Sequence, residues 1–476
     1  MSNEFYYKKY VKYKSKYLNL QKYNKTFYDE YHQIHVDDIN KVTKIEIKNE
    51  NDNIYTDIKA DYFDRYTELE ELVIKGTHIK QLPKNIFNNL KKLKTHKIVN
   101  NQITKLPEKI FDNLEKLEKL EIFEPIKKLP IDIFSNLSML KELDISVNSI
   151  KTPGNRVSGL SKLNLEKLYL SINVYLTKNT KTFPKNIFQD LKNIKELTII
   201  GYGISSLPKN IFLTLNTLEK LIIKNTSIQK FPETIFNNLM KLKELEIVDE
   251  DMADTYNVKH LPENIFNKLI NLTSLVLIYR PSGKLSPKST IFNGLQNLKL
   301  LHLTTDSKVQ CPLNGDKVKM IIENKIFNEL KNLKVLNLTN TRLAANNAEM
   351  LFRNLTSLEE IVLDYTNIEY DSLRKNCFKN SVNLKYIKYI NSTFMNLPDR
   401  NVSNPQIPEY KDLVSQEMWN KKEGDKGVHH QNYKFDGNEA AKIEEIRGTG
   451  KVLVYIYTPK YVSDYYDRIW GKLIVW

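Results

Sequence analysis

The sequence has little of what several classes of protein require. Two cysteines in 476 residues cannot build a disulfide framework, and nothing indicates an oxidising compartment. Only 14 glycines and 16 prolines, with 41% hydrophobic and 27% charged residues, exclude a collagen-like or disordered chain. No run of about 18 apolar residues occurs, so we expect no membrane span. The first nine residues lack the apolar core of a signal peptide, so we expect an intracellular, cytoplasmic protein that is not secreted.

Residues arranged for chemistry are equally scarce. The histidine pairs His32/His35 and His429/His430 have no cysteine or carboxylate at ligand spacing, so we expect no metal. No histidine stands near Cys311 or Cys377 to activate a thiolate. No phosphate-binding glycine loop or nucleophile elbow occurs. The sequence therefore predicts a protein that is not an enzyme and needs no cofactor.

The one feature of the composition that suggests a function is the excess of basic over acidic residues. The chain has 72 Lys+Arg against 57 Asp+Glu, a formal net charge of +15. A basic chain invites nucleic acid or an anionic surface as a partner. The abundance of Lys, Asn, Ile and Tyr also fits the drift of an A/T-rich coding genome, in which lysine accumulates without a function.

An internal repeat dominates the sequence. The phrase from Leu82 to Leu90, Leu-Pro-Lys-Asn-Ile-Phe-Asn-Asn-Leu, returns from Leu106 and, in varied form, at later positions with steps near 24 residues and some longer ones. Its anchor residues are Phe63, Phe87, Phe111, Phe134, Val157, Phe188, Phe212, Phe236, Phe266, Phe292, Phe327, Phe352 and Phe378. One structural repeat is therefore copied along the chain, with loops inserted in some copies.

A strand pattern, L-x-x-L-x-L-x-x-N/T-x-L in outline, follows each anchor. One copy reads Leu140, Leu143, Ile145, Asn148 and Ile150. Alternation at the fourth and sixth positions predicts a short strand buried on one side. A single repeat cannot cover its own apolar edge, so the repeats must stack into a parallel sheet with the phenylalanines packed behind it. The polar residue at position nine is suited to hydrogen-bond the turn that leaves the strand.

These motifs resemble the leucine-rich repeat family, in particular its 24-residue type, over residues 42 to 397. The resemblance implies an α/β repeat solenoid, a horseshoe with a concave parallel β-sheet that usually binds another protein. A strand pattern at Val42 to Ile54 precedes the thirteen anchored ones, which gives fourteen candidate repeats. Departures are the Thr, Asp or Glu that most copies carry where the family prefers Asn, and a copy at Leu117 that is one residue short.

The repeated Leu-Pro-x-x-Ile-Phe-x-x-Leu phrase also resembles an F-box, the module that recruits ubiquitin ligases. An F-box occurs once in a chain, whereas this phrase recurs at the repeat spacing. Each copy is better interpreted as half of a repeat, and a ubiquitin-ligase adaptor is the less favoured function.

The outward positions of the predicted strands would form the concave, partner-reading face. Their charges nearly cancel, with nine basic and ten acidic residues, so this face is a poor candidate for nucleic acid. We predict a protein-binding band of apolar side chains with an acidic rim. Its apolar members are Phe123, Tyr169, Ile200, Ile222, Val248, Val276, Ile278 and Leu300, and its acidic members are Glu142, Asp144, Glu196, Glu244 and Glu246. The alternative is that Val and Ile are present because they favour strands even when exposed.

Three long steps place insertions directly after strands, at residues 173–181, 249–259 and 305–325. All leave the sheet on the same edge and would project from one rim as specificity loops. The acidic residues of the second loop lack the alternating spacing and glycine of a calcium loop, which favours a solvated tip.

The first 38 residues form a basic segment rich in tyrosine and lysine. Tyr6, Tyr10, Tyr13, Tyr17 and Leu20 follow helical spacing, which predicts an amphipathic helix within residues 5–28. Its candidate contacts to an anionic partner are Lys8, Lys9, Lys12 and Lys16. The helix would either cover the open end of the solenoid, bind a partner helix or bind nucleic acid. This opening also resembles the start of many proteins of giant DNA viruses.

Residues 399–476 follow the repeats and contain all three tryptophans. Residues 451–457 have the composition of a strand, and the segment would be a small C-terminal cap or a separate module. We thus expect three parts: residues 1–38, a solenoid over 39–398, and residues 399–476.

The leading hypothesis is a non-catalytic protein-binding solenoid, acting through its concave sheet and rim loops. The second is a basic structural or packaging protein whose N-terminal helix binds nucleic acid or an assembly partner.

Overall fold

The chain divides into two compact units, Met1–Ile228 and Gln229–Trp476, and the computed structural model describes part of each. The described residues are 26–28, 42–49, 56–147, 160, 163–173, 182–183, 185–228, 230–248, 261–279, 287–305, 321–339, 341–343, 348–363, 366, 378, 380–384, 386–389 and 453–456.

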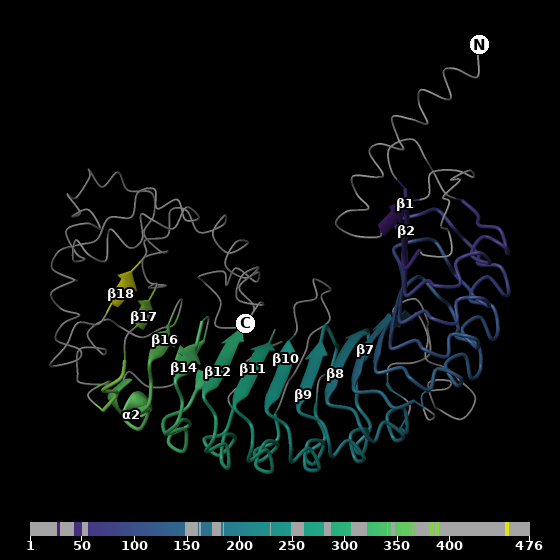
Figure 1. Cartoon of the computed structure of the whole chain (residues 1–476). Helices are drawn as coiled ribbons and strands as arrows, with labels where there is room; N and C mark the ends of the chain where they lie inside the picture. Colours follow the sequence, from purple (N-terminus) through teal and green to yellow (C-terminus); the bar gives the residue numbers. More distant parts are fainter. Residues whose placement is uncertain are drawn as a thin grey trace, which may run out of the picture. The chain divides into compact units, whose positions relative to one another are not determined.

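The first unit is built on a parallel sheet in which each strand pairs with the next one along the chain. β7, β8 and β9 lie side by side in this order (Figure 1). The strands are β1 (Thr26–Tyr28), β2 (Lys44–Lys48), β3 (Glu71–Lys75), β4 (Thr95–Val99), β5 (Lys119–Phe123), β6 (Glu142–Val147), β7 (Lys167–Asn173), β8 (Glu196–Tyr202) and β9 (Lys220–Lys224).

The second unit repeats this arrangement, again with parallel pairing between successive strands. Its main sheet contains β10 (Glu244–Val248), β11 (Ser274–Tyr279), β12 (Leu300–Thr305), β14 (Val335–Asn337), β16 (Glu360–Val362), β17 (Tyr386–Tyr389) and β18 (Leu453–Ile456). A separate pair joins β13 (Ile321–Ile322) to β15 (Arg342–Leu343), and α2 (Ala348–Phe352) is one short helix.

The alternation expected of half-buried strands is confirmed. In β5, Leu120 and Ile122 are fully buried, whereas Lys119, Glu121 and Phe123 are partly exposed on the other side. The same period of two recurs in β2, β4, β8 and β9. One side of the sheet therefore faces a continuous apolar core and the other faces outward.

The anchor phenylalanines form the predicted spine behind the sheet. In the first unit, the ring centroids of Phe87, Phe111 and Phe134 follow one another at 6.3 Å with nearly parallel planes. In the second, Phe236 and Phe266 lie 6.1 Å apart. These rings are buried and offset-stacked, an arrangement that stabilises beyond the burial of their area. Val157, which fills one anchor slot in the sequence, lies outside the described residues.

A glycine and an asparagine occupy equivalent positions in the turns that follow β3 and β4. Gly76 has φ 62° and donates its backbone N–H to the Val99 carbonyl at 3.0 Å. Asn100 has φ 57° and donates in the same way to the Phe123 carbonyl at 3.1 Å. Glycine and asparagine are the residues that adopt this left-handed conformation at least cost.

Polar residues at position nine hydrogen-bond the turns, as the sequence predicted. Asn101 donates its side-chain amide to the Ile74 carbonyl at 3.0 Å, and its Oδ1 accepts from the backbone and hydroxyl of Thr77. In the short repeat that follows, Glu124 takes over this role and accepts from the backbone N–H groups of Asn101 and Ile103. Burial raises the pKa of Glu124, although the hydrogen bonds from Asn101 and Ile103 act to lower it.

The two ends differ in part from expectation. The last three residues of the segment in which a helix was predicted, Thr26–Tyr28, are not helical: they form strand β1 and extend the sheet beside β2. Thr, Phe and Tyr are residues that favour strands, and the open edge of β2 supplies the backbone partners. Residues 1–25, with Lys8, Lys9, Lys12 and Lys16, lie outside the described residues. The strand predicted within 451–457 is confirmed as β18, which pairs with β17.

Most of each predicted rim loop, at residues 174–181, 249–260 and 306–320, also lies outside the described residues. Within the part of the chain that the structure describes, no helix is both long and apolar enough to span a membrane. In the same part, no cluster of His, Cys, Asp and Glu is arranged to hold a metal ion.

Candidate partner-binding face

The candidate site is the side of the first unit's sheet that points away from the leucine core, here called the outer face. It is carried by the strands β4 to β8, whose first, third and fifth side chains point outward. The parallel register places equivalent residues of successive strands side by side in rows. The face therefore has a row at the start of the strands, one in the middle and one at the end.

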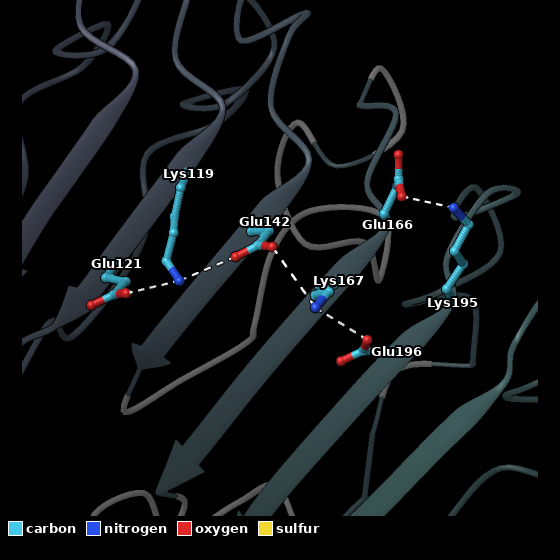
Figure 2. A network of polar contacts seen from close by, with 7 residues as sticks. All are labelled: Lys119, Glu121, Glu142, Glu166, Lys167, Lys195 and Glu196. Atoms are coloured by element: carbon cyan, nitrogen blue, oxygen red, sulfur yellow. Dashed lines mark hydrogen bonds and ion pairs between the residues drawn. The ribbon is translucent and has the colours of Figure 1, made fainter. Parts of the chain in front are cut away.

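Charged side chains of alternating sign pair across the first row (Figure 2). The Lys119 ammonium lies 3.1 Å from Glu142 and 3.3 Å from Glu121. The Lys167 ammonium lies 3.1 Å from Glu196 and 3.9 Å from Glu142. Burial acts to lower the pKa of Lys119, but its hydrogen bonds to Glu142 and Glu121 outweigh this and raise it. We call this run of ion pairs the charge ladder.

A second row of ion pairs lies one residue before the strands. Glu166 and Lys195 are 2.8 Å apart (Figure 2), and Glu70 and Lys94 are 3.0 Å apart. The hydrogen bond between Glu166 and Lys195 lowers the pKa of the carboxylate and raises that of the ammonium.

The order of charged residues in the sequence could have predicted this pairing, although the hydrophobic pattern alone does not. The two residues at each strand start reverse their charge order from repeat to repeat: Glu118-Lys119, Lys141-Glu142, Glu166-Lys167, Lys195-Glu196 and Glu219-Lys220. Glu142 and Glu196, expected as an acidic rim, are therefore already paired within the chain. Their charges are balanced by Lys119 and Lys167.

Aromatic side chains occupy the centre of the outer face. The rings of Phe123 on β5 and Tyr169 on β7 meet edge to face, with centroids 5.5 Å apart. Burial raises the pKa of the Tyr169 phenol, and the nearby Tyr202 and Asp144 raise it further. Tyr202 is held in turn by the side-chain amide of Asn225, which donates to its hydroxyl at 3.3 Å.

Two isoleucines extend the apolar surface toward β9. Ile200 is on β8 and Ile222 is on β9, where Ile222 is the register partner of Thr198. Both are partly exposed. The structure thus brings all the residues predicted for this unit onto one face: Phe123, Glu142, Asp144, Tyr169, Glu196, Ile200 and Ile222.

In the second unit the prediction is only partly right. Glu244, Glu246, Val276 and Leu300 are partly exposed on the corresponding face of its sheet. Val248 and Ile278 were also expected there as exposed contacts, and this is wrong: they are 4% and 6% exposed.

The register explains part of this burial. Val248 pairs with Ile278, and Ile278 pairs with Thr304, which is 1% exposed. Side chains in one row of a parallel sheet are about 4.8 Å apart, so these three short side chains cover one another's flanks. Val248 and Ile278 are therefore part of the packed structure.

Comparisons with known proteins agree with this geometry. A model of the leucine-rich repeat region matches residues 44–253, and a model of the BspA type leucine rich repeat region matches residues 313–408. No curated protein matches the chain.

Solved structures share the fold at low sequence identity. TLR13, from its complex with ssRNA13, is 23% identical with a TM-score of 0.58 over 76% of this chain and 49% of its own. A leucine-rich repeat protein of Leptospira interrogans is 22% identical, with a TM-score of 0.56 over 76% of this chain and 83% of its own. Drosophila Toll, from its complex with Spatzle, is 17% identical, with a TM-score of 0.50 over 77% and 47%. The chain thus spans about half the length of TLR13 and of Toll.

Stacked parallel strands, one buried and one outward side, and a spine of rings behind the sheet define a repeat solenoid. The period, the strand pattern and the two matching models identify the kind of repeat: residues 44–253 and 313–408 consist of leucine-rich repeats.

Proposed function

We propose that this protein is a non-catalytic scaffold that binds another protein through the outer face of its first unit, with the neighbouring rim loops adding contacts. The observation that supports this is that the charged side chains of the face pair with one another, whereas its apolar side chains remain partly exposed. Its lysines and most of its carboxylates bind one another in the charge ladder. The apolar side chains Phe123, Tyr169 and Ile200 stay partly exposed beside them. Apolar surface surrounded by polar groups is typical of protein-binding sites.

Charge favours a protein over a nucleic acid at this face. The Toll neighbour was solved with Spatzle and the TLR13 neighbour with ssRNA13, so proteins of this fold have been solved with partners of both kinds. Phosphate binding needs a basic stripe. On β4 to β8, four outward carboxylates, Glu121, Glu142, Asp144 and Glu196, face only three lysines, Lys97, Lys119 and Lys167. We infer that a polyanion would be repelled here.

The test is a pair of substitutions on the face. Ile200→Lys combined with Ile222→Lys places two charges in the apolar surface and should abolish capture of the partner from the cell in which the protein acts. Leu213→Lys is the matched control, because Leu213 is 53% exposed but lies in the turn before β9. Equal capture by the double variant and the control would remove the outer face from the proposal.

The net charge of +15 supports a second candidate function, in which the lysines of residues 1–25 bind nucleic acid or an assembly partner. Since Thr26–Tyr28 pair with β2, the informative truncation removes residues 1–24 only. Loss of binding to an anionic column, with protein capture retained, would assign the basic function to this segment. Salt-sensitive binding to nucleic acid by the truncated chain would refute it.

A further inference from the structure

Asp144 is an exception among the carboxylates at the centre of the outer face. It lies in the middle of β6, with Glu121 of β5 and Tyr169 of β7 as its register partners. Glu121 is paired with Lys97 at 3.0 Å, and Glu142 is paired with Lys119. The Asp144 carboxylate forms no ion pair or hydrogen bond with any of the residues that the structure describes.

The surroundings of Asp144 make its negative charge costly. Burial of the carboxyl raises its pKa, and the charges of Glu121 and Glu142 raise it further. Lys119 and Lys97 act in the opposite direction through space. A half-buried carboxylate without a partner is stabilised by any cation that reaches it.

Aromatic rings stand on both sides of the strand that carries Asp144. Phe123 on β5 and Tyr169 on β7 approach to 5.5 Å between centroids although β6 runs between them. The register partner of Phe123 on β6 is Ser146, followed by Ser171 on β7. These small side chains leave the two rings free to meet. Asp144 and Tyr169 are register partners on neighbouring strands, so their side chains leave the outer face next to each other.

We propose that Phe123, Asp144 and Tyr169 together bind an arginine side chain presented by the partner protein. A guanidinium ion stacks on aromatic rings and pairs with carboxylates, so both parts of the cluster suit it. It would supply the cation that Asp144 lacks, whereas the lysines of the charge ladder are already engaged. This inference rests on the proposed protein-binding function and adds to it the chemistry of the central contact.

The test uses peptides, because it then needs no identified partner. A random peptide library displayed on phage is selected on the immobilised full-length chain. The selected peptides are resynthesised with citrulline, the uncharged analogue of arginine, at each arginine. Binding is measured on the wild type, on Asp144→Asn, and on Glu71→Gln, which removes an outward carboxylate that is paired with Lys44 at 2.9 Å.

We expect the peptides to share an arginine and to bind Asp144→Asn at least about tenfold more weakly, about 1.4 kcal/mol. Citrulline should cause a similar loss, and Glu71→Gln should cause none. Asp144→Asn should unfold at the same temperature as the wild type or slightly higher, because the carboxylate has no partner to lose and its charge is costly where it lies.

Other results separate the two proposals. Peptides that lose binding with Ile200→Lys and Ile222→Lys, yet lack arginine and ignore Asp144→Asn, would overturn this inference and leave the proposed function standing. Peptides that bind through lysine, with arginine inactive, would also overturn it. A library in which no peptide responds to the two isoleucine substitutions would count against the outer face itself.

Discussion

Glu124 and Asn101 are joined by two hydrogen bonds to one carboxylate oxygen. Glu124 Oε1 accepts from the Asn101 backbone N–H and from its side-chain amide, each at 2.8 Å. Glu124 Oε2 accepts from the backbone N–H of Ile103 at 3.1 Å. A glutamate thus satisfies three donors at a turn where the repeat is one residue short.

Substitution of Glu124 by alanine should therefore destabilise the first unit by about 2–3 kcal/mol. The change leaves the buried N–H groups of Asn101 and Ile103 without acceptors, which costs more than the loss of an exposed hydrogen bond. Urea unfolding measures the effect, with Glu115→Ala as the control because Glu115 is exposed. Equal midpoints for the two variants would contradict the role of Glu124.

His96 predicts a pH dependence of stability. It fills the slot of a core leucine, is fully buried, and its Nδ1–H donates to the Leu72 carbonyl at 3.0 Å. Burial lowers its pKa to about 4, against an ordinary value of 6.5. The unfolded chain therefore takes up a proton at higher pH than the folded chain, and stability falls as the pH drops from 6.5 toward 4. The loss should reach about 3 kcal/mol.

The comparison that isolates this effect is His96→Leu, which restores the repeat residue. The variant should keep every other titrating group, including the largely buried His302, and lose only this part of the acid sensitivity. Denaturant unfolding at several pH values between the two pKa values measures the difference. Parallel stability curves for wild type and variant would show that His96 does not titrate on unfolding.

Reversing one charge of the charge ladder should destabilise the first unit more than removing that charge. Lys167→Glu places a third carboxylate between Glu142 and Glu196, whereas Lys167→Gln only removes the two ion pairs. We expect about 1 kcal/mol of destabilisation for the reversal and a few tenths for the neutral change, since these side chains are partly exposed. Because salt screens exposed charges, the difference should shrink in about 1 M NaCl. A difference that is independent of salt would point to packing instead.

Two glycines in left-handed turns should respond differently to alanine. At Gly294, with φ 87°, a new Cβ would lie 2.7 Å from the Asn267 carbonyl oxygen. At Gly76, with φ 62°, no atom lies within 4 Å of the new Cβ. Gly294→Ala should cost about 3 kcal/mol from strain and overlap together, and Gly76→Ala about 1 kcal/mol from strain alone. Thermal unfolding of the two variants tests this order.

The repeats were predictable because their signal is local and redundant. Each Phe anchor, strand leucine and turn residue recurs at a fixed spacing, so one irregular copy does not obscure the rest. Phe87, Phe111 and Phe134 stack as the period requires. The replacement of a position-nine residue by Glu124 was not foreseen, because a deletion of one residue shifts the register and hides which side chain faces the turn.

The outward face was predictable in outline and less so in detail. Strand alternation correctly places Tyr169 and Ile200 outward, but it does not tell how deep an outward residue lies. Val248 and Ile278 are covered although their position in the strand is the same as that of exposed residues elsewhere. Which side chain pairs with a charged residue also depends on the neighbouring repeat. That the Asp144 carboxylate has no partner therefore becomes evident only once the ion pairs of the surrounding residues are known.

The central claim is that the outer face of the first unit holds a protein partner, and site-specific photo-cross-linking tests it most directly. A benzoylphenylalanine at position 200 lies on this face, and one at position 213 lies in the exposed turn before β9. Both full-length variants are irradiated in the cell in which the protein acts. The account predicts a discrete protein adduct from position 200 and none from position 213. Adducts from position 213 alone, or nucleic acid as the species joined to position 200, would contradict it.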